Sequence, residues 1–112
     1  MSYKVLPTPL FKREAKRLLK RFASLKEELA EAERSLQNNP IQGTPLGHNV
    51  YKLRVAIKSK GKGKSGGARI ITYVVMADST VFLLSIYDKS EISNIDDKTL
   101  KLLVADVRSR KI

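Results

Sequence analysis

Apolar residues recur every three or four positions near the start of the chain, which is the spacing of one helical face. The pattern begins after Thr8 and Pro9, a hydroxyl residue suited to the N-cap followed by proline at the first helical position. The apolar positions are Phe11, Ala15, Leu18, Leu19 and Phe22, and the basic positions opposite them are Lys12, Arg13, Lys16, Arg17 and Lys20. The segment predicts an amphipathic helix, preceded by a short strand over residues 3–6.

A second helical pattern follows after a short break. Ser24 and Glu27 have the S-x-x-E spacing of a capping box, which predicts a helix start at this point. The apolar stripe of this helix consists of Leu25, Leu29, Ala32 and Leu36. The helix is expected to end at Asn38-Asn39-Pro40, because proline cannot continue it. Two helices joined this closely predict an antiparallel helical hairpin.

From residue 41 onward the pattern changes to that of loops and strands. Residues 41–49 contain Gly43, Pro45 and Gly47 and are predicted as a loop. Strands are expected over residues 50–57, 68–76 and 80–87, with a turn at Asp78-Ser79 between the last two. The strand over 80–87 is the most apolar, so we expect it in the interior of the sheet.

A final helix is predicted near the C-terminus. Asp96 or Asp97 can cap it, after a polar and irregular stretch over residues 88–94. Its apolar positions are Leu100, Leu103, Val104 and Val107, and it ends in a basic tail.

The predicted element order is therefore β-α-α-β-β-β-α. Three consecutive strands joined by short connections favour antiparallel pairing. The expected fold class is α+β: a mostly antiparallel four-stranded sheet with an N-terminal helical hairpin and a C-terminal helix, with the helices packed on one face. Residues 1–112 are expected to form a single domain, since 112 residues is an ordinary length for one.

The charge balance narrows the range of partners. Lys and Arg number 22 against 11 Asp and Glu, a net charge of +11, and no acidic residue lies between Glu33 and Asp78. Such a balance is typical of proteins that contact nucleic acid, a ribosome, an acidic protein or an anionic membrane. The absence of cysteine excludes disulfides and thiolate metal sites. Without a signal-peptide pattern or an apolar run near the ~18 residues of a membrane span, we expect a cytoplasmic protein that does not enter a membrane.

Two local features approach known catalytic motifs without completing them. Gly63-Lys64-Ser65 matches the end of a G-x-x-x-x-G-K-[ST] phosphate loop, but position 58 is Lys58 and the following element is a strand rather than a helix. His48, the one histidine, can act as a general base near neutral pH. It lies in a predicted loop without cysteines or carboxylates at ligand spacing, so no metal site is expected and His48 reads more simply as a loop residue.

A third feature combines cations with a phenol at the strand ends. Alternation predicts that Ser85, Tyr87 and Lys89 point to the same side of the last strand. Antiparallel neighbours can bring further cations to the same end, namely Lys52, Arg54 and Arg69. The glycine-rich loop adds Lys58, Lys60, Lys62 and Lys64, which can hold a nucleic-acid backbone. The same residues also fit an ordinary strand end and loop with solvated charges.

Three stretches of the sequence together resemble a known family. They are Tyr51-Lys52-Leu53-Arg54, the run Gly63-Lys64-Ser65-Gly66-Gly67-Ala68-Arg69-Ile70-Ile71, and Val81-Phe82-Leu83-Leu84-Ser85-Ile86-Tyr87-Asp88-Lys89-Ser90-Glu91. This combination, with the predicted element order, resembles the RelE/HigB branch of bacterial type II toxins, within the RelE/ParE superfamily. The resemblance covers nearly the whole chain.

The resemblance implies a toxin that acts as a ribosome-dependent mRNA endoribonuclease. Such enzymes cleave mRNA in the ribosomal A site by attack of a ribose 2′-hydroxyl on the adjacent phosphate, without a metal or other cofactor. By position, Arg69 matches the phosphate-binding arginine of the family, and Lys52 and Arg54 match its basic strand pair. Lys89 matches the basic residue that can protonate the leaving oxygen, provided that its pKa is depressed. Tyr87 is placed to stack on a base or orient the nucleotide.

The sequence departs from some relatives, and other functions stay open. It has neither the Glu/His pair nor the C-terminal tyrosine found in parts of the family, which leaves Lys52 and His48 as candidates for the general base. One alternative is a ParE-like protein that inhibits DNA gyrase without nuclease activity. Another is a non-catalytic RNA- or ribosome-binding protein.

The resemblance also implies a protein partner. A cognate antitoxin is expected to cover the toxin, and with a net charge of +11 here an acidic segment of that partner is expected. The mRNA on the ribosome is the second expected partner. Direct DNA binding is not expected of this chain alone.

Overall fold

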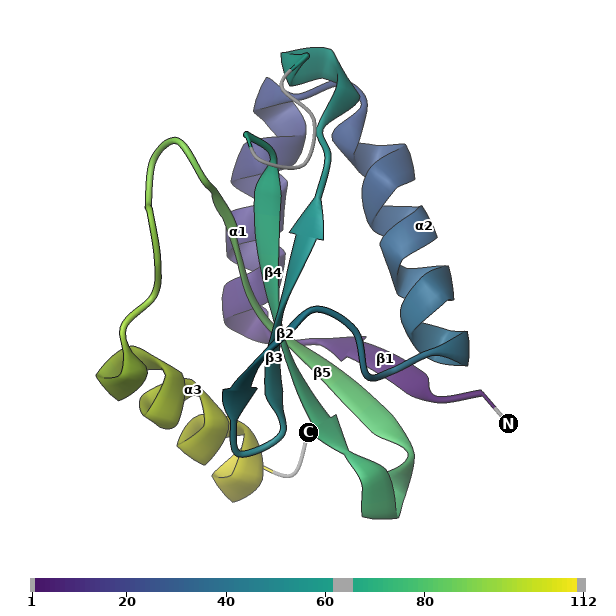
Figure 1. The fold of residues 1–112 in the computed structure, drawn as a ribbon, viewed down its shortest axis with the longest axis vertical. Helices are drawn as coiled ribbons and strands as arrows, with labels where there is room; N and C mark the ends of the chain where they lie inside the picture. Colours follow the sequence, from purple (N-terminus) through teal and green to yellow (C-terminus); the bar gives the residue numbers. More distant parts are fainter. Residues whose placement is uncertain (1, 62–65, 111–112) are drawn as a thin grey trace.

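The computed structural model describes residues 2–61 and 66–110 of the chain (Figure 1). Its helices and strands, in chain order, are β1 (Lys4–Pro7), α1 (Pro9–Arg21), α2 (Leu25–Asn38), β2 (Thr44–Gly47), β3 (Val50–Val55), β4 (Ala68–Val75), β5 (Thr80–Asp88) and α3 (Asp97–Arg110). Short 3-10 turns follow β3 at Lys58–Lys60 and β4 at Met76–Asp78. The α+β class and the predicted element order are confirmed, with one strand added before β3.

The described strands form a five-stranded sheet in the order β1-β5-β4-β3-β2. β1 runs parallel to β5, and the remaining neighbours are antiparallel. The prediction of four strands is therefore wrong in number, because β2 forms where a loop was expected. β5 lies between β1 and β4 and is buried along its whole length, which confirms its predicted interior position.

β2 forms an edge hairpin with β3 through a tight turn. Gly47 pairs with Val50, and the two intervening residues, His48 and Asn49, have φ angles of 54° and 66°. Two successive positive φ angles are typical of the type I′ turn, whose twist suits an antiparallel hairpin. Pro45 lacks a backbone donor but is tolerated because β2 is an edge strand. Glycine and proline therefore led to the prediction of a loop at a position where the structure has a strand.

The helices cover both faces of the sheet, which corrects the prediction that they pack on one. α1 and α2 cover one face, here called the hairpin face, where their buried side chains contact Val81, Leu83 and Ile86. α3 covers the other, here called the α3 face, through Leu100 and Val107. In Figure 1, α1 passes behind β4, while α3 lies to the left of the strands. A strand covered on both sides reads as a continuous apolar run, as β5 does.

The predicted start of α1 is confirmed, whereas the predicted start of α2 is only partly so. Thr8 Oγ1 accepts a hydrogen bond from the backbone N–H of Phe11 at 3.2 Å and donates one to the carbonyl of Leu83 at 2.9 Å. α2 begins at Leu25, but Ser24 makes no cap bond and no capping box forms. Its Oγ instead lies 3.0 Å from Glu28 Oε1 and accepts the N–H of Ser59 at 3.0 Å. At the start of α3, Asp96 is the capping aspartate, accepting the N–H of Thr99 at 2.8 Å.

A β-bulge in β5 reverses the facing of its side chains. The pairing with β4 shifts between Ile71 and Thr72, which face Ser85 and Leu83, so that Leu84 is the extra residue. Before the bulge, odd-numbered residues face the helical hairpin and even-numbered ones face α3. After it, Ile86 faces the hairpin and Tyr87 faces α3. Ser85 pairs with Ile71 and Tyr87 with Arg69, so the register places both on the α3 face, as the predicted alternation requires. The Ser85 hydroxyl contacts Glu14 of α1.

Loss of the Thr8 hydroxyl should destabilise the fold. Thr8→Ala is expected to lower the free energy of unfolding by about 1–2 kcal/mol, because both the N-cap bond and the bond to β5 disappear. Thr8→Ser keeps a hydroxyl and should lose much less. Urea denaturation followed by circular dichroism measures both, and equal stability of the two variants would contradict this role.

Candidate functional site

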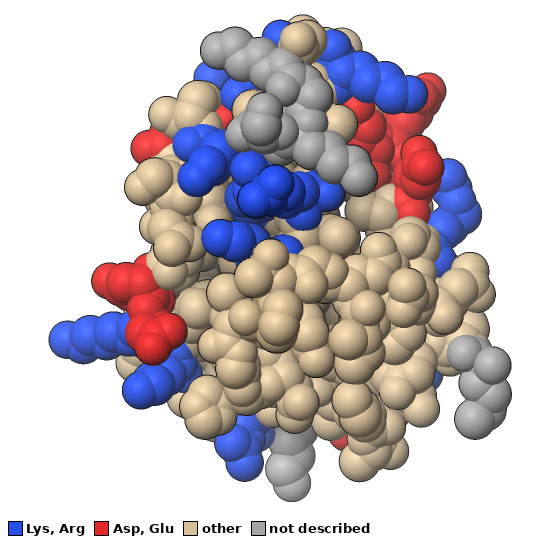
Figure 2. Space-filling view, viewed as in Figure 1, with Lys and Arg blue, Asp and Glu red and all other residues tan. Residues whose placement is uncertain are grey.

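The predicted site residues on the strands come together on the α3 face. Arg54 lies opposite Arg69, and Arg69 lies opposite Tyr87, so three neighbouring strands contribute to one row. Side chains at such directly opposed positions have Cβ atoms roughly 4.5–5.5 Å apart. Lys52 lies two residues before Arg54 and therefore on the same face. Figure 2 shows Lys and Arg side chains gathered over β3 and β4, above a largely uncharged area at the lower centre of this view.

Arg69 and Tyr87 form the buried half of this row. Arg69 is 4% exposed and Tyr87 is 1% exposed, and Arg69 Nη1 donates to the carbonyl of Ala68 at 3.1 Å. Burial lowers the pKa of Arg69, the nearby Arg54 lowers it further, and Tyr87 raises it. Burial raises the pKa of the Tyr87 phenol, against the opposing effect of Arg69. The Tyr87 hydroxyl is buried without a hydrogen-bond partner among the described residues.

Lys52 and Arg54 form the accessible half. Arg54 is exposed and Lys52 is half-buried. Within residues 2–61 and 66–110, neither of them forms an ion pair with a carboxylate. The two side chains therefore present positive charge to solvent beside the buried Arg69.

Lys89 lies at the end of the row, just after β5. Its backbone N–H donates to the carbonyl of Gly67 at 3.0 Å, which continues the strand pairing beyond Asp88. Its ammonium donates to the carbonyl of Ser93 at 2.8 Å. Lys89 thus follows Tyr87 at the spacing of one strand face, and the loop after β5 holds its side chain.

The predicted phosphate-binding lysines of the loop separate into different environments. Lys60 Nζ lies 2.7 Å from Asp88 Oδ1 and 5.5 Å from the centre of the Phe22 ring, so it faces the helical hairpin. Lys58 is exposed, and its backbone N–H donates to Glu28 Oε2 at 2.7 Å. Lys62 and Lys64 lie outside the described residues. The ion pair gives Lys60 a structural contact, so the site proposed below does not include it.

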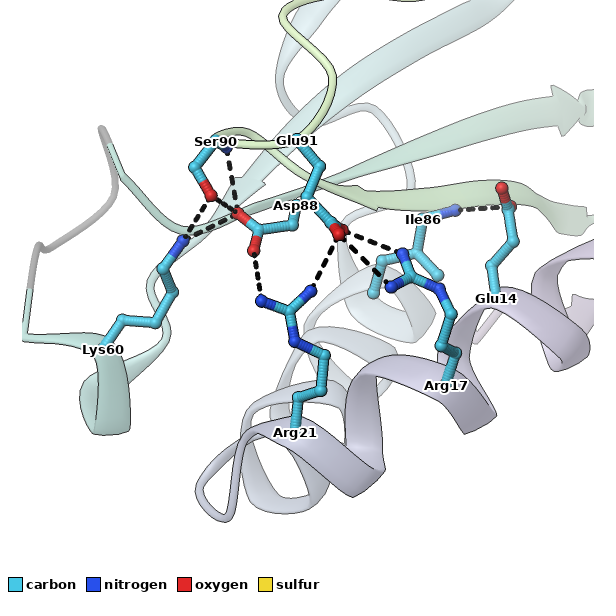
Figure 3. A network of polar contacts seen from close by, with 8 residues as sticks. All are labelled: Glu14, Arg17, Arg21, Lys60, Ile86, Asp88, Ser90 and Glu91. Atoms are coloured by element: carbon cyan, nitrogen blue, oxygen red, sulfur yellow. Dashed lines mark hydrogen bonds and ion pairs between the residues drawn. The ribbon is translucent and has the colours of Figure 1, made fainter.

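A charged network lies behind the site, on the hairpin face (Figure 3). The fully buried Asp88 accepts hydrogen bonds from Lys60, at 2.7 Å, and from the Ser90 N–H and hydroxyl, at 3.0 and 2.8 Å. Burial alone would raise the pKa of Asp88, but these hydrogen bonds outweigh burial and hold it below its ordinary value. Glu91 pairs with Arg17 and with Arg21, each at 2.9 Å.

This network ties the end of β5 to α1 and to the turn after β3. The sequence analysis missed it because Asp88 was read as part of a polar, irregular segment. An aspartate that directly follows a long apolar strand was the available signal, since such a position is buried and needs a partner.

His48 lies away from the row of cations. It occupies the β2–β3 turn, whereas Arg54 is near the opposite end of β3, six residues along the chain, or roughly 20 Å in an extended strand. With Leu46 and with Leu100 and Val104 of α3, it lines a cavity of about 410 Å³. This separation removes His48 from the candidates for a general base at the row.

Across residues 2–61 and 66–110 no group of three or more His, Cys, Asp or Glu side chains has a metal-binding arrangement. Among the helices of the same residues, none combines the length and apolar character needed to span a bilayer.

Comparison with known proteins identifies a family and several similar folds, among them two toxin structures. A family model described as the RelE toxin of the RelE/RelB toxin–antitoxin system matches residues 3–107. The structure of the toxin–antitoxin complex RelBE2 from Mycobacterium tuberculosis gives 20% identity and a TM-score of 0.58, over 79% of this chain and 92% of that chain. A mutant of the Escherichia coli toxin RelE in the free state gives 16% identity and a TM-score of 0.58, over 100% of both chains. At these identities the two structures support the fold, and the family model supports membership.

The Asp88–Lys60 pair should matter for stability and for its pH dependence. Asp88→Asn is expected to lower the free energy of unfolding at pH 7 by about 3–5 kcal/mol, because a largely buried ammonium loses its counter-charge. The folded pKa of Asp88 is depressed, so its contribution is complete above the ordinary value of 3.8 and is lost as the pH falls through the lower folded pKa.

Urea denaturation of wild type and variant from pH 7 to pH 2 measures both effects, and the variant should lose less stability in acid. Asp106→Asn is the matched control, since Asp106 pairs with Arg110 at the surface and should contribute little. Equal losses for the two variants at pH 7 would contradict the buried role of Asp88.

Proposed function

Because the chain belongs to the RelE toxin family of toxin–antitoxin systems, we propose that it is the toxin of such a system and a ribosome-dependent endoribonuclease that cleaves mRNA. The observation that carries this proposal is the row formed by Arg54, Arg69 and Tyr87. Two guanidinium groups lie on adjacent strands of one face, beside a buried phenol, and Arg54 makes no ion pair with a carboxylate within residues 2–61 and 66–110.

Positively charged side chains can promote this reaction without a metal ion. The 2′-hydroxyl of one nucleotide loses its proton and attacks the adjacent phosphorus, and the bond from phosphorus to the 5′-oxygen of the next nucleotide breaks. A 2′,3′-cyclic phosphate forms, and the leaving oxygen takes up a proton. Negative charge on the phosphate oxygens grows on the way to the transition state. Fixed cations therefore stabilise the transition state more than the bound substrate.

Each residue of the row has a role that fits its environment. Arg69, held by burial, binds the phosphate in a fixed position. Arg54, exposed beside it, reaches a second phosphate oxygen. The Tyr87 hydroxyl has no hydrogen-bond partner within residues 2–61 and 66–110, which supports a polar ligand here, because buried hydroxyls rarely lack a partner without a functional reason. It can donate to the phosphate or orient the nucleotide.

Proton transfer falls to the lysines at the two ends of the row. The Lys89 ammonium lies next to Tyr87 on the same face of the strand. It acts as the general acid that donates a proton to the leaving 5′-oxygen. Its bond to the carbonyl of Ser93 is exchanged for the substrate. Lys52, half-buried on β3, is the remaining candidate for accepting the 2′-hydroxyl proton.

The proposed partners follow from the same surface. The mRNA is presented by the ribosome in the cytoplasm, and the cations of the α3 face bind its backbone. A cognate antitoxin neutralises the toxin, and the net charge of +11 favours an acidic segment in that protein. The similar structure from Mycobacterium tuberculosis is itself a toxin–antitoxin complex.

Removing the exposed guanidinium should abolish most activity without harm to the fold. Arg54→Ala is expected to reduce the rate of cleavage on programmed ribosomes by roughly 10²–10³, the usual loss for one donor to a developing oxyanion. Arg34→Ala removes the same charge from an exposed position on α2 and should cleave normally. Single-turnover cleavage measured by primer extension distinguishes the two, and equal rates would contradict the role of Arg54.

Replacing the buried arginine tests the geometry of phosphate binding. Arg69→Lys keeps the charge but loses the planar fork of donors, so cleavage is expected to fall while circular dichroism stays unchanged. Primer extension on cellular mRNA after brief induction should show new 5′ ends within translated frames for wild type, and far fewer for this variant and for Lys89→Ala. Growth arrest by the wild type with intact mRNA would overturn the nuclease proposal, and a gyrase supercoiling assay would then follow.

A further inference from the structure

We propose that Glu14 is a positioning residue of this site. At the edge of β5 beyond the end of β1, its carboxylate holds the β5 bulge that turns Tyr87 and Lys89 toward Arg69 on the α3 face. This inference rests on the proposed function, since it assigns to Glu14 the arrangement of residues that act on RNA. Glu14 lies on α1, whose apolar stripe packs on the hairpin face, and its carboxylate faces the edge of β5 beyond the end of β1.

Glu14 occupies an unusual position on its helix. It lies on the sheet-facing stripe of α1, next to Ala15 and one turn from Phe11 and Leu18, all three of which are buried. It is the one acidic residue of α1, whose other charged residues are all basic. A half-buried carboxylate among apolar side chains is costly unless donors satisfy it. At this position the carboxylate is expected to accept hydrogen bonds from specific donors in the protein rather than to be hydrated at the surface.

The donors that satisfy Glu14 come from the bulge itself. The Ser85 hydroxyl donates to Glu14 Oε1 at 2.8 Å, and the backbone N–H of Ile86 donates to the same oxygen at 3.2 Å. Figure 3 shows the Glu14 carboxylate directed at the backbone nitrogen of Ile86. Both donors immediately follow Leu84, the extra residue of the bulge.

α1 holds the other side of the bulge as well. The Thr8 hydroxyl donates to the carbonyl of Leu83 at 2.9 Å and lies 3.3 Å from the carbonyl of Leu84. The start of α1 thus binds the acceptors that precede the bulge, and Glu14 binds the donors that follow it. The start of α1 and Glu14 therefore hold the irregular part of β5 along the edge where β1 ends.

The bulge decides which residues belong to the site. Because side chains alternate along a strand, a shift of one residue sends each following side chain to the other face. If the same residues paired with β4 without a bulge, Tyr87 and Lys89 would face the helical hairpin. Ile86 would then lie opposite Arg69, and Asp88 would follow it on the α3 face. A carboxylate there would neutralise the cation that binds phosphate. The contact to Glu14 stabilises the arrangement that avoids this.

The experiment compares Glu14→Ala and Glu14→Gln with the wild type in two measurements. The first is cleavage on programmed ribosomes, with kcat and KM determined separately. The second is the NMR signal of the Tyr87 ring in protein with ¹³C-labelled tyrosine, assigned with Tyr87→Phe. Glu14→Ala is expected to lower kcat on the order of 10²-fold, with little change in KM because Lys52 and Arg54 remain on β3, and to move the Tyr87 signal. Glu14→Gln keeps an amide oxygen for the Ile86 N–H and should recover most of both.

Controls separate positioning from general stability. Glu33→Ala removes an exposed carboxylate from α2 and should change neither measurement. If Glu14→Ala does not fold, Ser85→Ala, which removes one of the two donors, should give a smaller loss of kcat and a smaller shift of the Tyr87 signal. A variant with reduced stability but wild-type kcat and an unmoved Tyr87 signal would overturn the inference. If the wild type itself does not cleave, the proposed function fails, and the Tyr87 signal alone decides the role of Glu14.

Discussion

The structure depends on a strand that is covered on both faces and changes its facing once. β5 is buried along its whole length, with the helical hairpin on one side and α3 on the other. A bulge at Leu84 lets the strand place Leu83 and Ile86 in one core and Leu84 and Tyr87 in the other. The same change of facing divides the polar end of the strand. Asp88 meets the cations of the hairpin face, while Tyr87 meets Arg69 on the α3 face.

Much of the fold could be predicted because the local signals agreed with the final structure. Thr8 and Pro9 gave the start of α1, and the apolar run of β5 gave an interior strand. The failures have physical causes. The hairpin of β2 depends on positive φ angles at His48 and Asn49, residue types without a strong turn signature in this order. The continuous apolar sequence of β5 also indicated that both faces of this strand are covered. It does not indicate which helix covers which face. Ser24 was expected to cap α2 with its hydroxyl. That hydroxyl instead accepts a hydrogen bond from the backbone N–H of Ser59, thirty-five residues along the chain.

The site could be predicted as a group of residues but not as an arrangement. Arg54, Arg69 and Tyr87 were assembled by pairing antiparallel strands, and the registers bring them into one row. Lys60 shows the limit of that reasoning. In the sequence it is one of several loop lysines, and only the packing of the turn against β5 shows that it neutralises Asp88. The role of Glu14 could not be predicted for a similar reason. A bulge depends on the strand register and not on residue type, and the sequence pattern of α1 does not indicate a contact with β5.

The two faces of the sheet differ in charge at the end of β5. Carboxylates and cations pair on the hairpin face, whereas cations cluster on the α3 face, and this difference explains why the row suits a phosphate. On the hairpin face, Asp88 and Glu91 pair with Lys60, Arg17 and Arg21, so the network is largely balanced. On the α3 face, burial lowers the pKa of Arg69, and the nearby Arg54 lowers it further through repulsion between like charges. The Tyr87 hydroxyl, unpaired among the described residues, costs on the order of 1–3 kcal/mol. An anion bound at this row would relieve both costs, and the relief would grow as the phosphate gains charge during attack. The row is therefore suited to bind an anion more tightly as the charge of that anion grows.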